Sequence, residues 1–430
     1  MFFYYKTRKG VKMYYTLNNG VYIVNGKVKS CIYDLNESKL YSINKVLAEK
    51  VNQINKGQIR VDSVDEELKK VLDGFVGQGL IKMSELPETH QIDEIKEDRS
   101  RCKFAWIEIT SKCNLRCIHC YNESDIRCDN IMSLSQFKQV IDILLEMEVP
   151  KIQIIGGEPF CDKTVLRNML NYTVGKFEYI EIFTNGTLVP EMWFDYLAEN
   201  NIHIALSVYS YNPEMHDLVT GIKGSLERTN KTIEELKRHG ISYRVCNVLM
   251  KDIELGEKTN DLYTLSEEKD VVRMSGRANF NLLSDELIKK KLITKKSFQK
   301  PIKRTFCKRL ISGHNCFRDK IYISANMEVF PCVMERRMKH CVIDEHKQII
   351  LDDNIRYFTK DKVNECSECE YRYACFDCRP NSLSENIYEK PWYCTYNPRL
   401  AEWEDEDAFI TELRNNWDET TESCSQINLS

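Results

Sequence analysis

The sequence lacks any apolar run that approaches the length of a membrane-spanning helix, which needs roughly 20 such residues. Its first residues, MFFYYKTRKG, lack the apolar stretch and the cleavage site of a secretory signal peptide. Neither sign of charge dominates, since 61 Lys and Arg stand against 65 Asp and Glu for a net charge of −4. We therefore expect a cytoplasmic protein with no membrane partner and no strong electrostatic affinity for nucleic acid.

Cysteine is the residue type in surplus. The chain of 430 residues has 18 of them, too dilute for a small disulfide scaffold and more than packing in a reduced cytosolic enzyme requires. Only Cys31 falls in the first hundred residues. At roughly 100 to 200 residues per domain the length allows about two to four domains. We expect metal or redox chemistry to begin after an N-terminal module.

Residues 1–83 are expected to form a small winged-helix-like α+β domain. Short stretches typical of strands, MYYTL, VYIV, KSCIYDL and KLYSI, are separated by turn signals that include Asn-Gly pairs. From about Asn44 onward, apolar residues recur at helical spacing in two amphipathic segments. Residues 84–100 follow as a mixed-charge stretch with little apolar content, which predicts an exposed linker.

Residues 101–300 alternate between strand patterns and helix patterns. The expected strands are 105–110, 151–156, 179–184, 202–208, 243–250 and, from a weaker pattern, 271–276. Repeated βα units imply parallel strands with right-handed crossovers, hence an open sheet or a barrel. The remaining residues, 301–430, are rich in cysteine and show short elements only.

Cys113, Cys117 and Cys120 form a CX3CX2C motif directly after the first of these strands. Barrels of this class place their reactive groups in the loops at the C-terminal ends of their strands. Three thiolates can ligate three irons of a four-iron cluster and leave the fourth iron open. The alternative is a zinc site, although zinc sites normally use four ligands in paired CX2C knuckles.

The motif, with His119 before its last cysteine, resembles the signature of the radical S-adenosylmethionine (SAM) superfamily. The resemblance implies a partial (β/α)6 TIM-like barrel and a [4Fe–4S] cluster whose open iron binds SAM. It also implies that reduction of the cluster cleaves SAM to a 5′-deoxyadenosyl radical. The residues that match SAM contacts of the family are Gly156, Gly157, Glu158, Pro159, Thr184, Asn185, Ser207 and Arg228.

These matched residues also have plainer interpretations. Gly-rich and Thr-Asn-Gly stretches are common turns, and a Ser near a strand end or an Arg on a helix is commonplace. Tyr209 stands where the family often has an Asp, which disfavours the mechanism of the anaerobic sulfatase-maturating enzymes. No residue can be named as a catalytic acid or base.

The C-terminal cysteines resemble those of a SPASM domain, a module that holds auxiliary iron–sulfur clusters. The resemblance implies an inner [4Fe–4S] cluster on Cys307, Cys316, Cys332 and Cys378, and an outer one on Cys366, Cys369, Cys375 and Cys394. Met327 replaces the usual Gly and the last spacing is CX2C, so the inner cluster could have an open iron. A zinc ribbon is the alternative. The other cysteines are expected to be packing residues: Cys31, Cys102, Cys128, Cys161, Cys246, Cys341 and Cys424.

The N-terminal module, placed ahead of such a core, resembles the PqqD-like leader-recognition domain of peptide maturases. Such a domain binds an extended leader peptide as an added strand. The candidate edge here is 29–43, with the second helix beside it. A winged helix that binds DNA or serves only protein packing is the alternative.

The three resemblances together imply an enzyme that modifies a ribosomally made precursor peptide and forms Cys-derived thioether links. It would carry three [4Fe–4S] clusters, bind SAM, and take electrons from a reductant such as flavodoxin or ferredoxin. Carbon–carbon or carbon–oxygen crosslinking, epimerisation and formylglycine formation are alternatives on the same scaffold. A non-catalytic or zinc-bearing peptide-binding protein is the alternative of another class.

Overall fold

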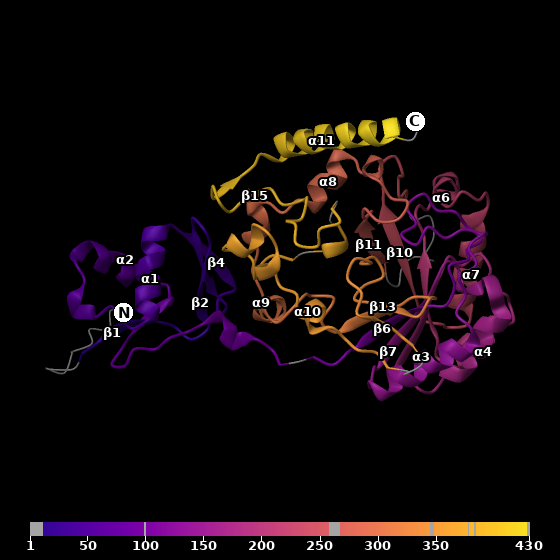
Figure 1. Ribbon diagram of the computed structural model, residues 1–430, viewed down its shortest axis with the longest axis horizontal. Helices are drawn as coiled ribbons and strands as arrows, with labels where there is room; N and C mark the ends of the chain where they lie inside the picture. The colour runs from indigo at the N-terminus through magenta and orange to yellow at the C-terminus, as the bar shows by residue number, and fades with distance from the viewer. Residues whose placement is uncertain are drawn as a thin grey trace.

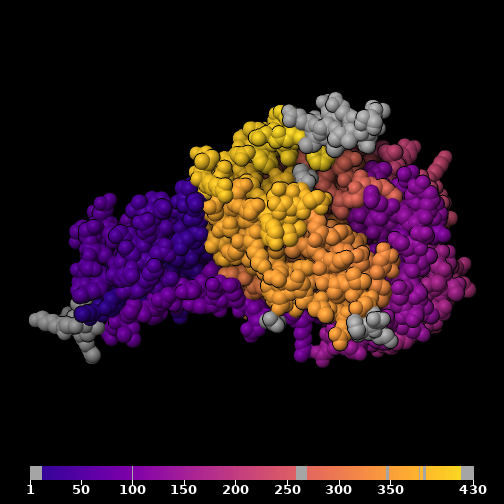
Figure 2. Space-filling model, viewed as in Figure 1, coloured from indigo at the N-terminus to yellow at the C-terminus, as the bar shows by residue number. Residues whose placement is uncertain are grey.

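The computed structural model describes residues 12–98, 100–257, 267–344, 348–376, 378–381 and 384–427. Three parts lie in a row, with an N-terminal module at one end, an α/β barrel at the other and the Cys-rich part between them (Figure 1). Figure 2 shows the Cys-rich part filling the surface between the module and the barrel. The N-terminal segment MFFYYKTRKG, which lacks signal-peptide features, and the side chain of Cys424 lie outside the described residues.

The N-terminal module consists of two small sheets and two helices. Its elements are β1 (Tyr14–Leu17), β2 (Val21–Asn25), β3 (Ser30–Asp34), β4 (Lys39–Ile43), α1 (Lys45–Asn55), α2 (Glu66–Gly77) and β5 (Ile81–Ser84). Strands β2, β3 and β4 form one antiparallel sheet, and β1 pairs with β5. Asn44 and Asp65 cap the two helices by accepting hydrogen bonds from the backbone N–H groups of Leu47 (2.9 Å) and Leu68 (2.8 Å). The module has the α+β composition expected from the sequence.

The β2–β4 sheet is covered on both faces. Helix α1 packs on β2 and β3, whereas α2, the helix expected beside the 29–43 edge, packs on β5. The opposite face carries Tyr22 and Tyr33, which share a hydrophobic cluster with Tyr371 of the Cys-rich part. The Tyr33 hydroxyl donates a hydrogen bond to the carbonyl oxygen of Glu370 (3.0 Å). The module is therefore fixed to the Cys-rich part. Because both faces of the β2–β4 sheet are covered, an added strand would have to pair at an edge of this sheet.

The predicted linker is exposed along most of its length, yet it is anchored at more than one point. Ile95, in a short 3-10 turn (Ile92–Ile95), is 4% exposed and joins the same hydrophobic cluster. Two residues later the Glu97 carboxylate pairs with the Arg318 guanidinium (2.6 Å).

The barrel has the six parallel strands that the sequence predicts. They are β6 (Phe104–Glu108), β7 (Lys151–Ile155), β8 (Tyr179–Thr184), β9 (His203–Ser207), β10 (Tyr243–Leu249) and β11 (Glu267–Val271). The helices between them are α3 (Leu134–Glu146), α4 (Lys163–Thr173), α5 (Trp193–Glu199), α6 (Pro213–Thr220) and α7 (Ser225–Arg238). The sixth strand ends at Val271, where the predicted one begins. Its sequence, EEKDV, is mainly polar. The prediction, which relied on apolar residues, therefore placed this strand too late in the chain.

Three strands of the C-terminal part extend the same sheet. Strand β12 (Lys320–Ile323) runs parallel to β6, followed by β13 (Glu328–Phe330) and β14 (Cys341–Val342) in antiparallel order. The sheet order is β11-β10-β9-β8-β7-β6-β12-β13-β14. The sheet is therefore continuous across the boundary that the sequence placed between residues 300 and 301.

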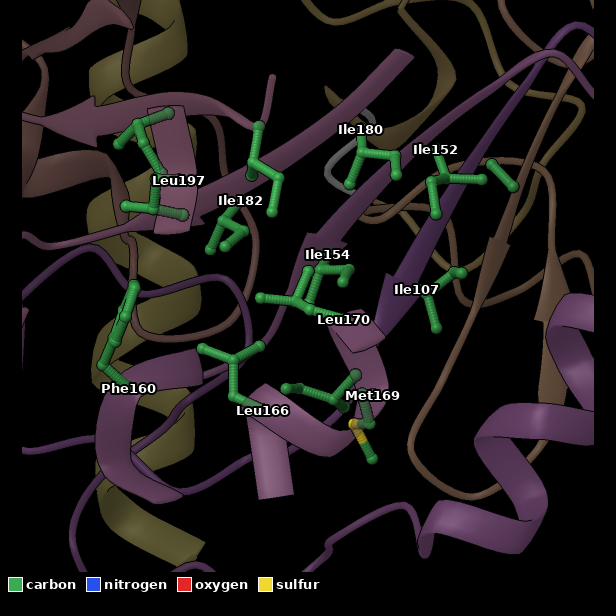
Figure 3. Packing of buried hydrophobic residues seen from close by; sticks show 14 of the residues in the cluster. Ile107, Ile152, Ile154, Phe160, Leu166, Met169, Leu170, Ile180, Ile182 and Leu197 are labelled. Atoms are coloured by element: carbon green, nitrogen blue, oxygen red, sulfur yellow. The ribbon is translucent and has the colours of Figure 1, made fainter. Parts of the chain in front are cut away.

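The barrel core lies between the strands and the helices outside them. Ile152 and Ile154 of β7 pack with Leu166 and Leu170 of α4 (Figure 3). Fully burying such a side chain contributes roughly 1.5 to 3 kcal/mol. Because side chains alternate along a strand, Gln153 points to the other face, where it lines a cavity. One face of the sheet thus stabilises the barrel and the other forms the site.

The rest of the chain after β11 has short elements and one long helix. These elements are α8 (Asp285–Lys291), α9 (Arg304–Ile311), α10 (Asp353–Arg356), β15 (Tyr396–Asn397), β16 (Glu402–Trp403) and α11 (Glu406–Ile427). Helix α11 lies over α8 (Figure 1), and the Arg414 guanidinium pairs with the Asp285 carboxylate (2.9 Å). In the described part of the chain, no helix is both long and apolar enough to cross a membrane.

Candidate active site

A cavity of about 290 Å³ opens at the C-terminal ends of the barrel strands. Parallel strands end at the same edge of a sheet, so the loops that follow them meet there. The cavity wall includes the Gly156-Gly157 pair after β7, Thr184 and Asn185 at the end of β8, and Ser207 at the end of β9. Trp106, Phe183 and Val248 contribute an apolar part of the wall.

The CX3CX2C loop follows β6 and lines this cavity with all three cysteines, Cys113, Cys117 and Cys120. Helix α6 fixes the middle of the loop, because the N–H groups of Arg116 and Ile118 donate to carbonyl oxygens of α6 (3.0 and 3.1 Å). Burial raises the pKa of the Cys117 thiol to about 12 and also raises the pKa of Cys113. Thiols with raised pKa values stay protonated at neutral pH when nothing is bound, whereas a bound metal deprotonates a coordinating thiol outright. These two thiols are therefore better suited to binding a metal than to reacting as free thiolates.

Gly156 and Gly157 let the loop after β7 cross directly over the CX3CX2C segment. The Gly157 N–H donates to the carbonyl oxygen of Thr110 (2.7 Å), and the next N–H donates to that of Lys112 (2.8 Å). A Cβ atom on Gly156 would collide with the Thr110 backbone, and one on Gly157 with the Lys112 backbone. At these two positions only glycine allows the approach.

The carboxylate of Glu158 is fully buried and lies outside the cavity wall. It accepts hydrogen bonds from the Thr184 hydroxyl (2.7 Å), the Asn185 N–H (2.7 Å) and the Phe160 N–H (3.0 Å). Burial raises the pKa of Glu158, and these donors oppose the rise. In this structure Glu158 holds the loop after β7 to the loop after β8.

The Thr184-Asn185-Gly186 turn is held from two sides. The Asn185 side-chain amide donates to Asn114 in the CX3CX2C loop (3.0 Å). From α7, the Thr229 and Thr232 hydroxyls donate to the carbonyl oxygens of Asn185 (2.7 Å) and Gly186 (2.6 Å). Neither threonine was predicted to belong to the site, although residues three apart on a helix share a face.

The structure brings most of the matched residues together and leaves three outside. Those lining the cavity are Cys113, Cys117, Cys120, Gly156, Gly157, Thr184, Asn185 and Ser207. Glu158 and Pro159 are buried beside it, and Arg228 is exposed on α7. The sequence-based assignment of Arg228 and Glu158 as SAM contacts stays a prediction.

His119 and Tyr209 form an aromatic pair at the cavity. Their ring centroids lie 4.6 Å apart at 77°. The Tyr209 hydroxyl is hydrogen-bonded to the sulfur of Cys117 and to Ser207. Burial lowers the pKa of His119 to about 4, and its Nδ1 atom is buried with no hydrogen-bond partner. An unpartnered buried nitrogen at the rim of the CX3CX2C site is a polar group available to a bound molecule.

Cys246 was expected to be a packing residue, and the structure corrects this. Its side chain is half-buried and lines the cavity, where Arg244 Nη1 lies 3.0 Å from the Cys246 sulfur. The Arg244 guanidinium is held by the buried Glu181 carboxylate (2.8 Å). Cys246 is in register with Ser207 on the neighbouring strand, a relationship that spacing along the chain does not reveal. Cys31 and Cys102 are buried, as predicted.

The four cysteines assigned to the outer cluster line one small cavity of about 20 Å³: Cys366, Cys369, Cys375 and Cys394. Tyr371 and Lys360 share the cavity wall. Cysteines more than twenty positions apart in the sequence thus line the same cavity, as they must if they bind one cluster together.

Three of the four cysteines assigned to the inner cluster lie within electrostatic range of one guanidinium. Arg273, a residue of the large cavity, is close enough to Cys316, Cys332 and Cys378 to interact electrostatically with each thiol. The fourth, Cys307, is fully buried in the cluster shared with the N-terminal module, near Cys31. The inner ligand set stays a prediction.

These residues fit an iron–sulfur cluster with SAM. The donor set is three thiols from one loop on one cavity, with a close-packed Gly-Gly backbone and an orphaned His119 nitrogen beside them. Within the described ranges, no three His, Cys, Asp or Glu side chains are gathered tightly enough to hold a single metal ion. A four-iron cubane holds its cysteine ligands farther apart than a single metal ion does. The test for a cluster is therefore which thiols line the same cavity.

Comparison with known proteins identifies the barrel. Residues 107–258 match the family model of the Radical SAM superfamily. The antilisterial bacteriocin subtilosin biosynthesis protein AlbA of Bacillus subtilis (strain 168) is 36% identical over 165 residues, 37% of this chain and 37% of AlbA. Mycofactocin maturase MftC of Mycolicibacterium smegmatis is 31% identical over 136 residues, 31% of this chain and 34% of MftC. The matches span about a third of the length of these relatives.

The chain is also similar to solved structures. The histidine-tagged form of anSMEcpe with bound AdoMet superposes with a TM-score of 0.51 at 17% identity, over 68% of this chain and 93% of that chain. Streptococcus suis SuiB bound to S-adenosylmethionine has a TM-score of 0.49 at 14% identity, over 87% of this chain and 98% of that chain. At this identity the anSMEcpe match supports the fold alone. The expected TIM-like radical SAM barrel is confirmed.

Proposed function

We propose that this chain, which carries a radical SAM domain in residues 107–258, modifies a ribosomally made precursor peptide by joining a cysteine sulfur to carbon. The observation that carries the proposal is the composition of the cavity wall. The CX3CX2C loop forms one part of it, and another part is Val333 and Met334, which directly follow Cys332 of the inner set. A substrate in this cavity would lie between two groups of cysteines. The names of two relatives, a bacteriocin biosynthesis protein and a maturase, support a peptide substrate.

Cys113, Cys117 and Cys120 would hold a [4Fe–4S] cluster, and the polar atoms of the cavity wall are available to SAM. When bound, the reduced cluster and SAM supply a 5′-deoxyadenosyl radical. The chain's own residues position and shield the reacting groups. Arg277 holds the end of the CX3CX2C loop through its N–H, which donates to the carbonyl oxygen of Cys120 (3.0 Å). Apolar wall residues exclude water, which would otherwise open side reactions.

The chemistry requires an electron acceptor beside the cavity. Joining a thiol to a carbon that bears hydrogen removes two hydrogens. The radical takes one of them from the carbon as a hydrogen atom. The thiol hydrogen leaves as a proton, which reaches solvent, and one electron remains to be accepted. Cys316, Cys332 and Cys378 interact electrostatically with Arg273 of the cavity wall, and an auxiliary cluster held by them would be near enough to take the electron.

The N-terminal module would bind the leader of the precursor along β4. Among the described residues β4 pairs with β3 alone, so its outer edge has backbone groups available to an added strand. Its side chains from Lys39 to Ser42 are exposed or half-buried. The module's fixed contact with the Cys-rich part would keep a bound leader in a constant place relative to the cavity.

An electron donor and a reducing compartment also belong to the proposal. Reduction of the cluster needs a one-electron donor such as flavodoxin or ferredoxin. Free thiols and an open iron are compatible with a reducing cytoplasm, where disulfides are rare.

The mass of a precursor tests the function. Any short Cys-containing peptide encoded beside the gene is co-expressed anaerobically with the protein as the test precursor. The peptide should lose two hydrogens for each link, and its link cysteines should no longer react with iodoacetamide. Cys117→Ala should abolish the loss, whereas Cys341→Ala, which removes a half-buried cysteine of β14, should retain it. An unchanged mass with the unaltered protein would contradict the proposal.

A further inference from the structure

The outer cysteine site has a positively charged donor in contact with one of its sulfurs. Lys360 Nζ lies 2.9 Å from the sulfur of Cys375. Both residues line the cavity that also contains Cys366, Cys369 and Cys394. An ammonium group at this distance makes a charge-assisted hydrogen bond, roughly twice as strong as a neutral one.

The fold fixes Lys360 in this place. It begins a 3-10 turn (Lys360–Lys362) that packs on a second 3-10 turn (Cys366–Glu368), which carries the first cysteine of the set. The next residue, Asp361, is tied back by the Tyr373 hydroxyl (2.7 Å) and by Arg372 Nε (2.9 Å). The carboxylate nearest along the chain is thus directed to Arg372 and Tyr373, while the ammonium group of Lys360 reaches the sulfur.

The other charges around the site are engaged elsewhere. Lys390 is near Cys394, but its ammonium group pairs with Glu365 (3.3 Å). Glu370 is fully buried near Cys369, and the Tyr396 hydroxyl donates to it (2.6 Å). The direct contact between Lys360 and Cys375 therefore has the geometry to act on the sulfur itself.

We propose that Lys360 is a positioning residue that raises the reduction potential of the outer auxiliary cluster and so makes it an electron acceptor. The inference rests on the proposed function, in which four cysteines hold that cluster. A four-iron cluster gains one negative charge on reduction, and its potential depends on net charge, hydrogen bonds to its sulfurs and exposure to solvent. A nearby cation and a hydrogen bond to sulfur both favour the reduced form. A cluster with four protein ligands has no open iron, so transferring electrons is the chemistry left to it.

A redox titration followed by electron paramagnetic resonance tests the role. The background variant carries Ala at positions 113, 117 and 120, so that only auxiliary clusters contribute. The outer signal is the one lost in Cys375→Ala. In Lys360→Met this signal should titrate at lower potential, with the equilibrium constant for reduction falling about tenfold, equivalent to ~59 mV for one electron. Lys360→Arg, which keeps the charge, should stay close to the unaltered value.

The matched control is Lys362→Met, which removes an exposed lysine from the same turn and should leave the potential unchanged. An unchanged potential in Lys360→Met, or an equal shift in Lys362→Met, would overturn the role of Lys360 while leaving the proposed function standing. If Cys375→Ala removed none of the about four irons expected of one cluster, the outer cluster and the inference would both be wrong.

Discussion

The rings of His119 and Tyr209 meet edge to face, with their centroids 4.6 Å apart. The contact joins the CX3CX2C loop to the segment after β9, and the Tyr209 hydroxyl extends the connection to the sulfur of Cys117. In the sequence, Tyr209 was only the residue that replaces a family Asp. In the structure it is part of the support for the proposed cluster ligands.

Removing the Tyr209 hydroxyl should impair the proposed cluster without dislodging it. Tyr209→Phe keeps the ring contact with His119 and loses the hydrogen bond to Cys117. A hydrogen bond of this kind contributes about 0.5 to 1.5 kcal/mol, so we expect SAM cleavage to slow by up to about tenfold with iron content unchanged. Tyr211→Phe, in the buried core nearby, is the control. Equal rates for the Tyr209 variant and the unaltered protein would show that the hydroxyl has no such role.

Gly157→Ala should disrupt the crossing of the two loops. The new methyl group would collide with the Lys112 backbone, and such overpacking costs about 1 to 3 kcal/mol. Urea unfolding measures the loss, and iron content should fall with it. Gly74→Ala in α2 meets no atom within 4 Å and should gain up to about 1 kcal/mol from helix propensity. A Gly157 variant as stable as the unaltered protein would contradict the close approach.

Stability should fall below neutral pH because of a buried histidine. His216 is 1% exposed, and its Nδ1 accepts a hydrogen bond from the Tyr209 N–H (3.2 Å). Burial lowers the pKa of His216 from 6.5 to about 4. Between pH 6.5 and about 4 the unfolded chain binds a proton at His216 that the folded chain does not bind. The contribution of the neutral His216 to the free energy of unfolding is therefore complete above pH 6.5 and is lost as the pH falls toward 4. The effect amounts to about 3 kcal/mol.

Urea unfolding at several pH values checks the effect of His216. His216→Gln should reduce the dependence on pH but not abolish it, since His119 and His340 also have their pKa values lowered to about 4. An unaltered pH dependence in His216→Gln would contradict the assignment.

Hydrogen exchange should locate the leader peptide. Backbone amides of β4 on the unpaired edge should exchange readily in the free protein and become protected when the precursor is added. The central strand β3 is paired on both sides, so its amides should be protected throughout. Protection that appears only around the cavity, and not at 39–43, would exclude β4 as the leader site.

Local patterns in the sequence predicted the barrel well. Runs such as KIQIIG and YIEIFT contain the β-branched residues that become Ile152, Ile154 and Ile182 of the core. The motifs at the ends of these strands meet because parallel strands share a C-terminal edge. The edge strand β11 was predicted too late in the chain, since its sequence is polar. The addition of β12 to the sheet was not predicted, because it depends on a partner more than 200 residues away.

The contacts of the site were less predictable. Cys246 reaches the cavity through its register with Ser207, and Lys360 reaches Cys375 through the packing of two 3-10 turns. Neither contact corresponds to a recognisable spacing of residues along the sequence. Glu158 was expected to contact SAM from its motif, whereas its hydrogen bonds hold Thr184 and Asn185. Motifs name the residues of a site, and long-range packing decides which atoms face the cavity.

The origin of the hydrogen atom taken by the radical is the most direct test. A precursor peptide deuterated at its non-exchangeable carbons is incubated anaerobically with the reconstituted protein, SAM and dithionite, and the 5′-deoxyadenosine formed is analysed by mass spectrometry. We predict deuterium in 5′-deoxyadenosine together with a peptide that has lost one deuterium and one thiol hydrogen per link. Unlabelled 5′-deoxyadenosine with an unchanged peptide would contradict this prediction.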